Sequence, residues 1–263
     1  MQPLTESDFG AVRQLARTTC GIHLQEGKKA LVSSRLERLV RGYGFETFTE
    51  YIDFVSRSRQ SAEFTEFIDT LTTNHSGFWR EPEHFLFLQK NIFPNYGAGI
   101  RIWSSACATG EEPYTIAMCA LASGIPQCRI SASDISRTAL NAAIRGEYET
   151  AKVSALPGEW GGRYFSPASP TASELLRVIP AVKSLVAFAA LNLLQPFGHA
   201  GQFDVIFCRN VMIYFEQSTR DQLVERLVEQ LPSGGHLFTG HSETLLRLPA
   251  GLRYVQPATY RKV

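Results

Sequence analysis

Two adjacent glutamates, Glu111 and Glu112, follow a turn of small residues that ends at Gly110 and open a helical stretch. Because a short strand is predicted just before this turn, the arrangement is the one with which nucleotide-binding α/β domains bring backbone close to a ligand. A phosphate site would not place two carboxylates where the anion must bind. S-adenosylmethionine fits better, since it carries a sulfonium, an amino group and a ribose diol. The alternative is that the glutamates only complement the helix dipole.

Further candidate residues stand at the ends of the strands predicted later in the chain. Asp134 ends the second strand, about 20 residues beyond the glycine turn, where a carboxylate can hold a ribose diol. Asp134 could equally cap the helix that begins at Ser136. In an open parallel sheet, ligands bind outside the carboxyl ends of the strands. The other residues expected at this edge are Asn192, Leu193, Arg209, Asn210, Val211 and Tyr214.

These side chains match none of the common hydrolytic or phosphate-transfer sites. The sequence has no Ser-His-Asp order and no lysine-bearing phosphate loop, and its histidines lack metal-ligand spacing, so we expect no metal site. The histidines considered are His75, His84, His199 and His241. A site that binds a neutral or cationic nucleoside and positions a second group suits methyl transfer, because the sulfonium carries the reactivity and the protein supplies alignment and electrostatics.

The composition is that of an ordinary globular protein, with 44% hydrophobic and 19% charged residues among 263. A net charge of +1 gives no overall attraction to nucleic acid or membranes, so electrostatic recognition must be local. The five cysteines are scattered and form no Cys-x-x-Cys pair, which favours buried, reduced thiols. The first residues do not read as an export signal, and no apolar run approaches the ~20 residues that span a bilayer. We therefore expect a cytoplasmic protein.

Two kinds of structure must position the candidate residues. Residues 1–73 are predicted to form a small all-helical domain, and residues 74–99 a linker that also covers the cofactor. Residues 100–263 alternate strand and helix, which indicates an α/β domain with a parallel sheet. The alternation breaks after the second strand and its helix, and we expect an inserted small β-subdomain at about 155–190.

The segment at 72–80 leaves the helical pattern. It places an amide, a hydroxyl and a guanidinium from Asn74, Ser76 and Arg80 around two adjacent aromatic residues. An ordinary linker seldom carries this combination, which favours a ligand-binding role. A packed joint between domains is the simpler alternative, and both could hold at once.

The second predicted helix carries a local positive charge, with five basic groups and one acid between residues 28 and 41. Arg35, Arg38 and Arg41 fall on one face at helical spacing. Such a row is usually only a solvated face. The functional hypothesis is a docking surface for an acidic helix.

Six segments, in order, resemble the chemotaxis receptor methyltransferase family, called CheR-type. The segment from Thr72 to Arg80 resembles its Thr-Thr-Asn-x-[Ser/Thr]-x-Phe-[Phe/Trp]-Arg, and Ile102 to Tyr114 resembles its turn Ser-x-x-Ala-[Ser/Cys]-x-Thr-Gly-Glu-Glu-Pro-Tyr. The other segments are Ala132-Ser-Asp-Ile, Leu191-Asn-Leu-Leu, Phe203 to Phe215 and Gly240-His-Ser-Glu. The resemblance covers nearly the whole chain. It implies a Rossmann-like S-adenosylmethionine-dependent methyltransferase domain with an inserted small β-subdomain, preceded by a small all-α domain.

The resemblance also implies a reaction, the transfer of a methyl group from S-adenosylmethionine to glutamate side chains on a receptor's signalling coiled coil, leaving S-adenosyl-L-homocysteine. Carried over by position, the residues implied around the cofactor are Asn74, Ser76, Arg80, Glu112, Asp134, Asn192, Leu193, Asn210 and Val211. Arg209 is implied beside the incoming glutamate for orientation, and Tyr214 for a hydrogen bond or positioning. The basic face of Arg35, Arg38 and Arg41 is implied to dock the receptor.

Two departures from the family pattern and two alternative functions stay open. The turn at 166–174 lacks the glycines with which some members bind a receptor's C-terminal tether, so we expect no tether. We also expect none of the tetratricopeptide repeats that some relatives carry. One alternative is a carboxyl methyltransferase acting on a small acid. The other is a non-catalytic module that binds S-adenosylmethionine and regulates a partner. We expect a monomer that binds no nucleic acid and does not insert into a membrane.

Overall fold

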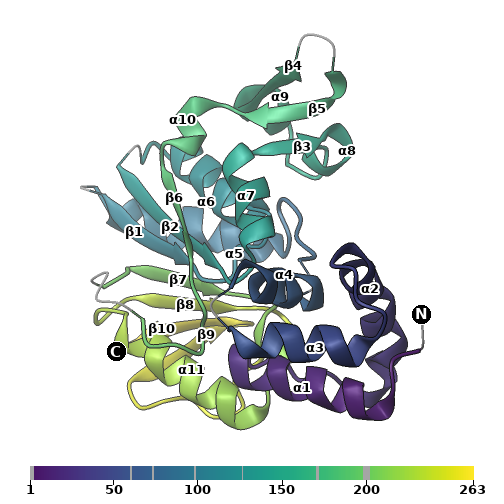
Figure 1. Cartoon of the computed structure of the whole chain (residues 1–263). Helices are drawn as coiled ribbons and strands as arrows, with labels where there is room; N and C mark the ends of the chain where they lie inside the picture. Colours follow the sequence, from purple (N-terminus) through teal and green to yellow (C-terminus); the bar gives the residue numbers. More distant parts are fainter. Residues whose placement is uncertain are drawn as a thin grey trace.

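The computed structural model describes residues 3–59, 61–72, 74–97, 99–125, 127–169, 172–197 and 202–263. A domain of helices packs beside a large sheet that has helices on both faces, and a small second sheet lies at the far end of the molecule (Figure 1). None of the described helices combines the length and the hydrophobicity needed to cross a bilayer.

The first domain is a bundle of four helices around one apolar core. The helices are α1 (Glu6–Cys20), α2 (Lys29–Gly42), α3 (Phe48–Arg57) and α4 (Ala62–Leu71). Their starts follow local chemistry, because Thr47 forms a capping box with Glu50 and the Ser61 side chain caps α4. Tyr51 and Phe67 are fully buried at the centre of the bundle.

The second domain is built on a seven-stranded sheet of order β6-β2-β1-β7-β8-β10-β9. The strands are β1 (Ile100–Ser104), β2 (Cys128–Asp134), β6 (Val186–Ala190), β7 (Val205–Cys208), β8 (His236–Thr239), β9 (Leu252–Gln256) and β10 (Thr259–Lys262). The pairs from β6 through β8 are parallel, and β10 is antiparallel to both of its neighbours. The chain moves outward from β1 to β2 and β6 and then returns to β7, so the strand order reverses between β1 and β7. Ligands bind at such a switch point.

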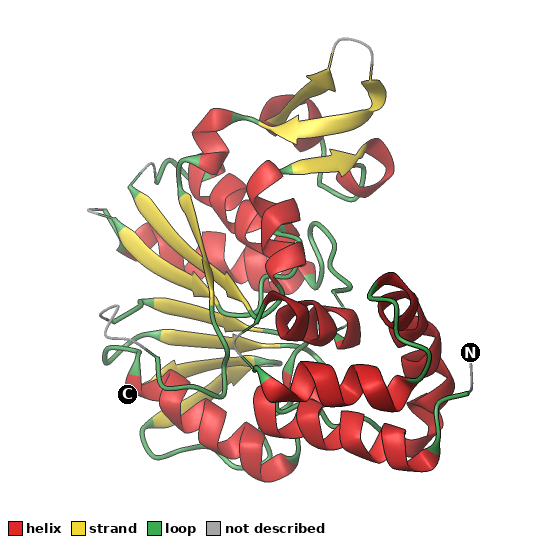
Figure 2. Cartoon of the chain, viewed as in Figure 1, coloured by secondary structure: helices red, strands yellow, loops and turns green. Residues whose placement is uncertain are grey.

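Side chains that alternate along the strands account for the layers on the two faces of the sheet. Ile102 and Phe207 join the apolar cluster that includes residues of α5 (Pro82–Phe87) and α6 (Glu111–Ala122). Trp103 and Ile206, one position away, pack in the cluster that includes α11 (Gln217–Glu229). Figure 2 shows the strands of the sheet between these helices, with α7 (Arg137–Arg145) beside α6. The carboxyl ends of the strands are left open toward the helical domain.

A small antiparallel sheet is inserted between α7 and β6. Its order is β3-β5-β4, and its elements are β3 (Glu147–Glu149), α8 (Thr150–Val153), α9 (Trp160–Tyr164), β4 (Phe165–Ser169), β5 (Ala172–Val178) and α10 (Pro180–Lys183). The inserted region was expected at about 155–190, but the small sheet begins earlier, at β3, and ends before residue 186. The strand at 186–190 pairs with β2 in the large sheet. The sequence pattern of β6 suits an edge strand of either sheet. With three residues, β3 is too short to be predicted from its sequence. Within the turn at 166–174, for which no tether was expected, Pro170 and Thr171 lie outside the described residues.

Candidate functional site

A cavity of about 470 Å³ lies at the carboxyl ends of β1, β2 and β7, where the sheet faces the helical domain. This volume falls in the range of small-molecule sites. The cavity also has residues of the helical domain in its wall, among them Ile22 and Leu71. The predicted cofactor and substrate residues that line it are Asn74, Ser76, Arg80, Glu112, Asp134, Asn192, Leu193, Arg209, Asn210, Val211 and Tyr214. The switch point of the sheet therefore brings together segments between residues 20 and 215 that are far apart in the sequence.

The turn between β1 and α6 depends on a glycine that no other residue could replace without strain. Gly110 has φ +94°, in the left-handed region that L-residues rarely adopt. A Cβ at this position would lie 2.8 Å from the Cβ of Ala143 and 2.9 Å from the Tyr148 hydroxyl. Ala108, in the same turn and in the wall of the cavity, also has a positive φ of 45°. The turn therefore brings main chain close to whatever occupies the cavity.

The two glutamates after this turn have different surroundings. Glu112 lines the cavity, and its carboxylate accepts hydrogen bonds from the Ser104 hydroxyl at 2.7 Å and from Nη1 of Arg209 at 2.9 Å. Burial raises the pKa of Glu112, and Arg209 and Ser104 lower it in part. Glu111 is fully buried away from the cavity and pairs with Nζ of Lys152 at 3.0 Å. Only Glu112 is therefore placed to meet a ligand in the cavity.

Arg209 is a buried cation held between two carboxylates. Its side chain is 2% exposed, Nη1 lies 2.9 Å from Glu112, and Nη2 lies 3.0 Å from Oε2 of Glu81. Nη2 also donates to the main-chain carbonyl of Arg80, and the guanidinium lies over the ring of Phe85 at 5.4 Å. Two carboxylates against one guanidinium leave this group with a net charge of −1, which favours a cationic ligand.

Asp134 is the last residue of β2 and lies in the wall of the cavity. Oδ2 accepts from the main-chain N–H of Ala108 at 2.8 Å, and Oδ1 accepts from that of Ser136 at 2.9 Å. The helix cap of α7 is Ser136 itself, because its hydroxyl accepts from the N–H of Ala139. Burial raises the pKa of Asp134, and these main-chain donors lower it in part. The carboxylate thus ties the glycine turn to the end of β2 and still faces the cavity.

The end of β7 is anchored by a glutamate that the sequence analysis did not single out. Glu243 is 1% exposed, and its carboxylate accepts from the N–H groups of Gly240, Asn210 and Ile213 at 2.7, 2.6 and 3.1 Å. Asn210 has a left-handed φ of 57°. A Cβ on Gly240 would lie 2.6 Å from both Nδ2 of Asn210 and Oε2 of Glu243, so a larger residue at this position would disturb the anchor. The only sequence signal for this anchor is the segment Gly240-His-Ser-Glu that contains it.

Contacts with neighbouring elements fix other predicted site residues. Nδ2 of Asn192 donates to the carbonyl of Thr19 at the end of α1, at 2.6 Å. The N–H of His23 donates to the carbonyl of Tyr214 at 2.7 Å. Asn74 donates to the Ser136 hydroxyl at 3.4 Å. These bonds connect the helical domain and the segment before α5 to the ends of the strands.

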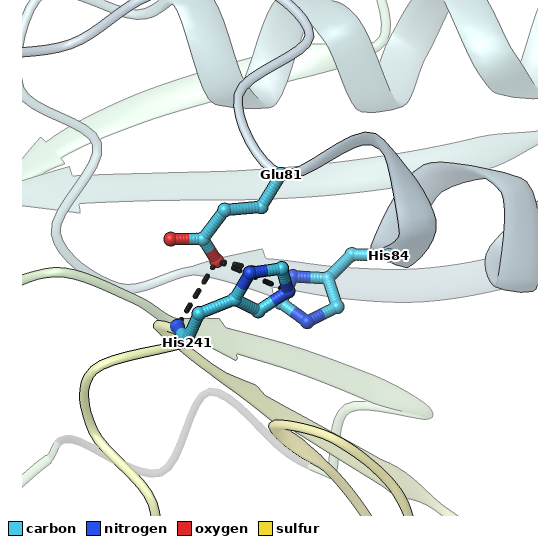
Figure 3. Close-up of side chains that lie close together, drawn as sticks. All are labelled: Glu81, His84 and His241. Atoms are coloured by element: carbon cyan, nitrogen blue, oxygen red, sulfur yellow. Dashed lines mark hydrogen bonds and ion pairs between the residues drawn. The ribbon is translucent and has the colours of Figure 1, made fainter.

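Glu81, His84 and His241 form a cluster (Figure 3), in which Glu81 also contacts Arg209. Oε2 of Glu81 lies 3.6 Å from Nδ1 of His84 and 4.0 Å from Nε2 of His241. His84 is fully buried, and burial together with Arg209 lowers its pKa to about 3, so its ring is neutral. The sequence spacing of the histidines did not predict this proximity, because the fold brings α5 next to the loop after β8. His199 lies outside the described residues.

The three arginines predicted to dock a receptor have different environments. Nη1 of Arg35 donates to the carbonyls of Thr70, Leu71 and Thr72 at the end of α4, at 3.4, 3.3 and 3.1 Å. Arg35 also lines the cavity. Arg38 is exposed on α2, and Arg41 is exposed and pairs with Glu37 one turn earlier. Arg35 therefore has a structural role that the other two do not share.

Family models and sequence relatives agree with this two-domain architecture. Residues 7–72 match the family model described as "CheR methyltransferase, all-alpha domain", and residues 74–260 match "CheR methyltransferase, SAM binding domain". The chain is 37% identical to the chemotaxis protein methyltransferase of Borreliella burgdorferi, over 98% of this chain and 95% of the relative. It is also 37% identical to that of Escherichia coli, over 93% and 87% of the two chains. The N-methyltransferase NodS of Bradyrhizobium japonicum, solved with S-adenosyl-L-homocysteine, aligns with a TM-score of 0.38 and 20% identity over 71% of this chain and 70% of NodS.

The residues of the cavity fit S-adenosylmethionine. The carboxylates of Glu112 and Asp134 face it, the Gly110 turn leaves room for close approach of main chain, and the group around Arg209 carries a net negative charge. The cofactor is therefore S-adenosylmethionine, and the chain is an enzyme that uses it as methyl donor. With the helical domain and the sheet domain both matched in order, the chain belongs to the CheR methyltransferase family.

Proposed function

We propose that the chain transfers a methyl group from S-adenosylmethionine to glutamate side chains of methyl-accepting chemoreceptors, forming glutamate methyl esters. The observation that carries this proposal is the buried Arg209 in the wall of the cavity, paired with Glu112 and Glu81. Family membership supports methylation in chemotaxis. A cavity between two domains supports an acceptor side chain that is presented by another protein.

The cofactor would be held by residues from both sides of the switch point. We propose that Glu112 binds the cationic amino-acid end or the ribose, and that Asp134 binds the ribose diol, since both carboxylates face the cavity. The further residues proposed around the cofactor are Asn74, Ser76, Arg80, Asn192, Leu193, Asn210 and Val211. Glu111 is left to stabilise the start of α6, where an acidic side chain complements the helix dipole.

The acceptor needs no general base. Bound S-adenosylmethionine supplies an electrophilic methyl group, and a glutamate with a pKa of ~4.3 is already an anion at neutral pH. We assign Arg209 to orienting the acceptor carboxylate. An arginine that bound the acceptor carboxylate strongly in the ground state would slow transfer. Glu81 and Glu112 offset the charge of Arg209 and thereby weaken such binding. Tyr214, in the same wall, would position the acceptor or donate a hydrogen bond to it.

The partner would be the acidic, helical methylation region of a receptor, docked on α2. Arg38 and Arg41 are exposed there, whereas Arg35 contributes by holding the end of α4 in place. The proposal includes no receptor tether and no nucleic acid. The monomeric state and the cytoplasmic location stay predictions.

The test is transfer of labelled methyl from S-adenosylmethionine to purified cytoplasmic domains of candidate receptors, scored as alkali-labile ester. The expected result is labelling that disappears when the receptor's methylated glutamates are replaced by alanine. Tight cofactor binding without labelling of any receptor would favour the non-catalytic module. Labelling of small dicarboxylic acids in place of receptors would favour the small-acid methyltransferase.

A further inference from the structure

The carboxylate of Glu81 joins three segments that meet beside the cavity. Oε2 accepts from Nη2 of Arg209 at 3.0 Å and from the N–H of His241 at 3.3 Å. Oε1 accepts from Nδ2 of Asn210 at 3.1 Å. The segment before α5, the end of β7 and the loop after β8 are therefore held together by one side chain. Burial raises the pKa of Glu81, but Arg209 and Asn210 outweigh it, so the carboxylate is ionised at neutral pH.

The main chain around Glu81 takes up a conformation that needs support. Trp79 and Glu81 both have left-handed φ values, of 57° and 58°, and flank Arg80. Such conformations are unfavourable for residues with a side chain and persist where surrounding contacts hold them. Here the contacts come from Arg209, whose Nη2 bonds both the Arg80 carbonyl and the Glu81 carboxylate. Arg80 lies in the cavity wall, so these bonds also fix that wall.

The charge of Arg209 depends on the same carboxylate. The guanidinium is almost fully buried, so solvent screens it poorly, and its two acidic partners are Glu81 and Glu112. Without Glu81, a single carboxylate would balance Arg209, and Nη2 would lose its side-chain acceptor. Compared with the full group, which carries a net charge of −1, a neutral Arg209–Glu112 pair would bind an acceptor carboxylate more tightly in the ground state and would attract the sulfonium less.

The two histidines behind Glu81 raise the question of a metal ion, since two imidazoles and one carboxylate are a common ligand set for zinc. The oxygen that both histidines face is, however, the one that lies 3.0 Å from the Arg209 cation. A divalent ion on that oxygen would stand next to a buried positive charge. The geometry therefore favours a hydrogen-bonded anchor, and metal binding becomes an outcome of the test.

We propose that Glu81 is a positioning residue for methyl transfer, which supplies the second negative charge beside Arg209, fixes Asn210 and holds the segment 74–81 against the cavity. The inference rests on the proposed methyl transfer to a carboxylate. Glu81 acts through Arg209 and Asn210 and is not assigned to the cofactor or the acceptor.

The test compares Glu81→Gln, which keeps the shape and removes the charge, with Glu81→Asp, which keeps the charge. Glu83→Gln is the matched control, because Glu83 is exposed two residues further on. We expect Glu81→Gln to lower kcat for receptor methylation at least tenfold, with a smaller rise in the Kd of S-adenosylmethionine. Glu81→Asp should recover part of kcat, and Glu83→Gln should match wild type. Wild-type kcat in Glu81→Gln, or no recovery in Glu81→Asp, would overturn the inference.

Amide hydrogen exchange gives a readout that does not depend on turnover. With S-adenosylmethionine bound, the amides of residues 74–81 and of His241 should exchange at least tenfold faster in Glu81→Gln than in wild type. Unchanged exchange contradicts the positioning role even if no receptor is labelled, whereas a wild type that labels no receptor contradicts the proposed function alone. Stoichiometric zinc retention by wild type, lost in His84→Ala and needed for turnover, would replace the anchor with a metal site.

Discussion

Nη1 of Arg209 lies 2.9 Å from Oε2 of Glu112, in a buried ion pair that joins the end of β7 to the first turn of α6. Removing one partner of a buried pair typically costs roughly 3–5 kcal/mol, because the other charge is left without compensation. The pair also stands in the wall of the cavity. We propose that Glu112 both binds the cofactor and positions Arg209, and the two roles can be separated by measuring binding and turnover.

Replacing Glu112 by alanine should weaken the binding of S-adenosylmethionine at least tenfold, which is about 1.4 kcal/mol. The change removes a carboxylate that faces a cationic ligand and leaves Arg209 paired with Glu81 alone. Titration calorimetry of the folded variant measures the affinity. Glu83→Ala, at an exposed position of α5, is the control and should bind like wild type. Wild-type affinity in Glu112→Ala would refute its assignment to the cofactor.

Tyr214→Phe separates positioning of the acceptor from binding of the cofactor. Loss of one hydrogen bond made in the transition state should lower kcat about tenfold, with the Kd of S-adenosylmethionine changed less than twofold. The main-chain bond between His23 and the Tyr214 carbonyl is unaffected by the substitution. Tyr254→Phe, on the exposed edge strand β9, provides the comparison. A kcat equal to that of wild type would show that the hydroxyl takes no part in transfer.

Gly110→Ala should be much more harmful than the same change at Gly124. Both glycines have positive φ, which costs an alanine about 1–2 kcal/mol, but the Gly124 site has no atom within 4 Å of the added Cβ. At Gly110 the Cβ would meet Ala143 and Tyr148 below 3.0 Å. The free energy of unfolding, measured in urea, should fall by about 2 kcal/mol or more beyond the loss at Gly124. Equal losses at the two sites would mean that the turn relaxes at little cost.

Much of the fold follows from local sequence signals. The caps at Thr47 and Ser61, the small-residue turn before α6 and the buried run of β7 each specify their element without help from distant residues. The five cysteines, predicted to be buried thiols, are all buried and free. The edge of the sheet at which the cavity lies could be predicted as well, because the carboxyl ends of parallel strands must meet at one edge.

The remaining features depend on residues far apart in the chain. Glu81 contacts Arg209 across 128 positions, and no local pattern indicates that pair (209 minus 81). Glu243 is recognisable as an anchor only once Asn210 is seen in a left-handed conformation. Arg35 looked like a surface arginine, but it holds the end of α4 because α2 and α4 pack together. Sequence periodicity reports which face of a helix is polar, not which element covers it.

The neutral, buried His84 should make the stability depend on pH. Its pKa is about 3 in the folded chain and near 6.5 when unfolded, so its contribution is fully present above pH 6.5 and is lost as the pH falls toward 3. From pH 7.5 to 5 this removes about 2 kcal/mol from the free energy of unfolding. His84→Phe should lose about that much less over the same range in urea unfolding. The exposed His75→Phe should follow wild type, and an unchanged slope in His84→Phe would assign the pH dependence to other groups.

Charge reversal on α2 tests receptor docking, and the structure decides which arginines to change. Arg35→Glu would disturb the end of α4, where Arg35 bonds three main-chain carbonyls, so the informative variant is Arg38→Glu with Arg41→Glu. Because exposed charges at the rim of an interface mainly steer association, we expect the KM for the receptor to rise roughly five- to tenfold, with a smaller effect at high salt. The Kd of S-adenosylmethionine should stay unchanged.

The matched control for this variant is Arg57→Glu with Arg59→Glu, which reverses two exposed charges at and just beyond the end of a different helix, α3. Its receptor KM should remain within twofold of wild type, since overall net charge has little effect compared with a local patch. Equal increases in KM in the two variants would indicate a nonspecific charge effect and would remove the docking role from α2. A parallel loss of cofactor affinity in a folded Arg38→Glu, Arg41→Glu variant would place these residues with the cavity and not with the receptor.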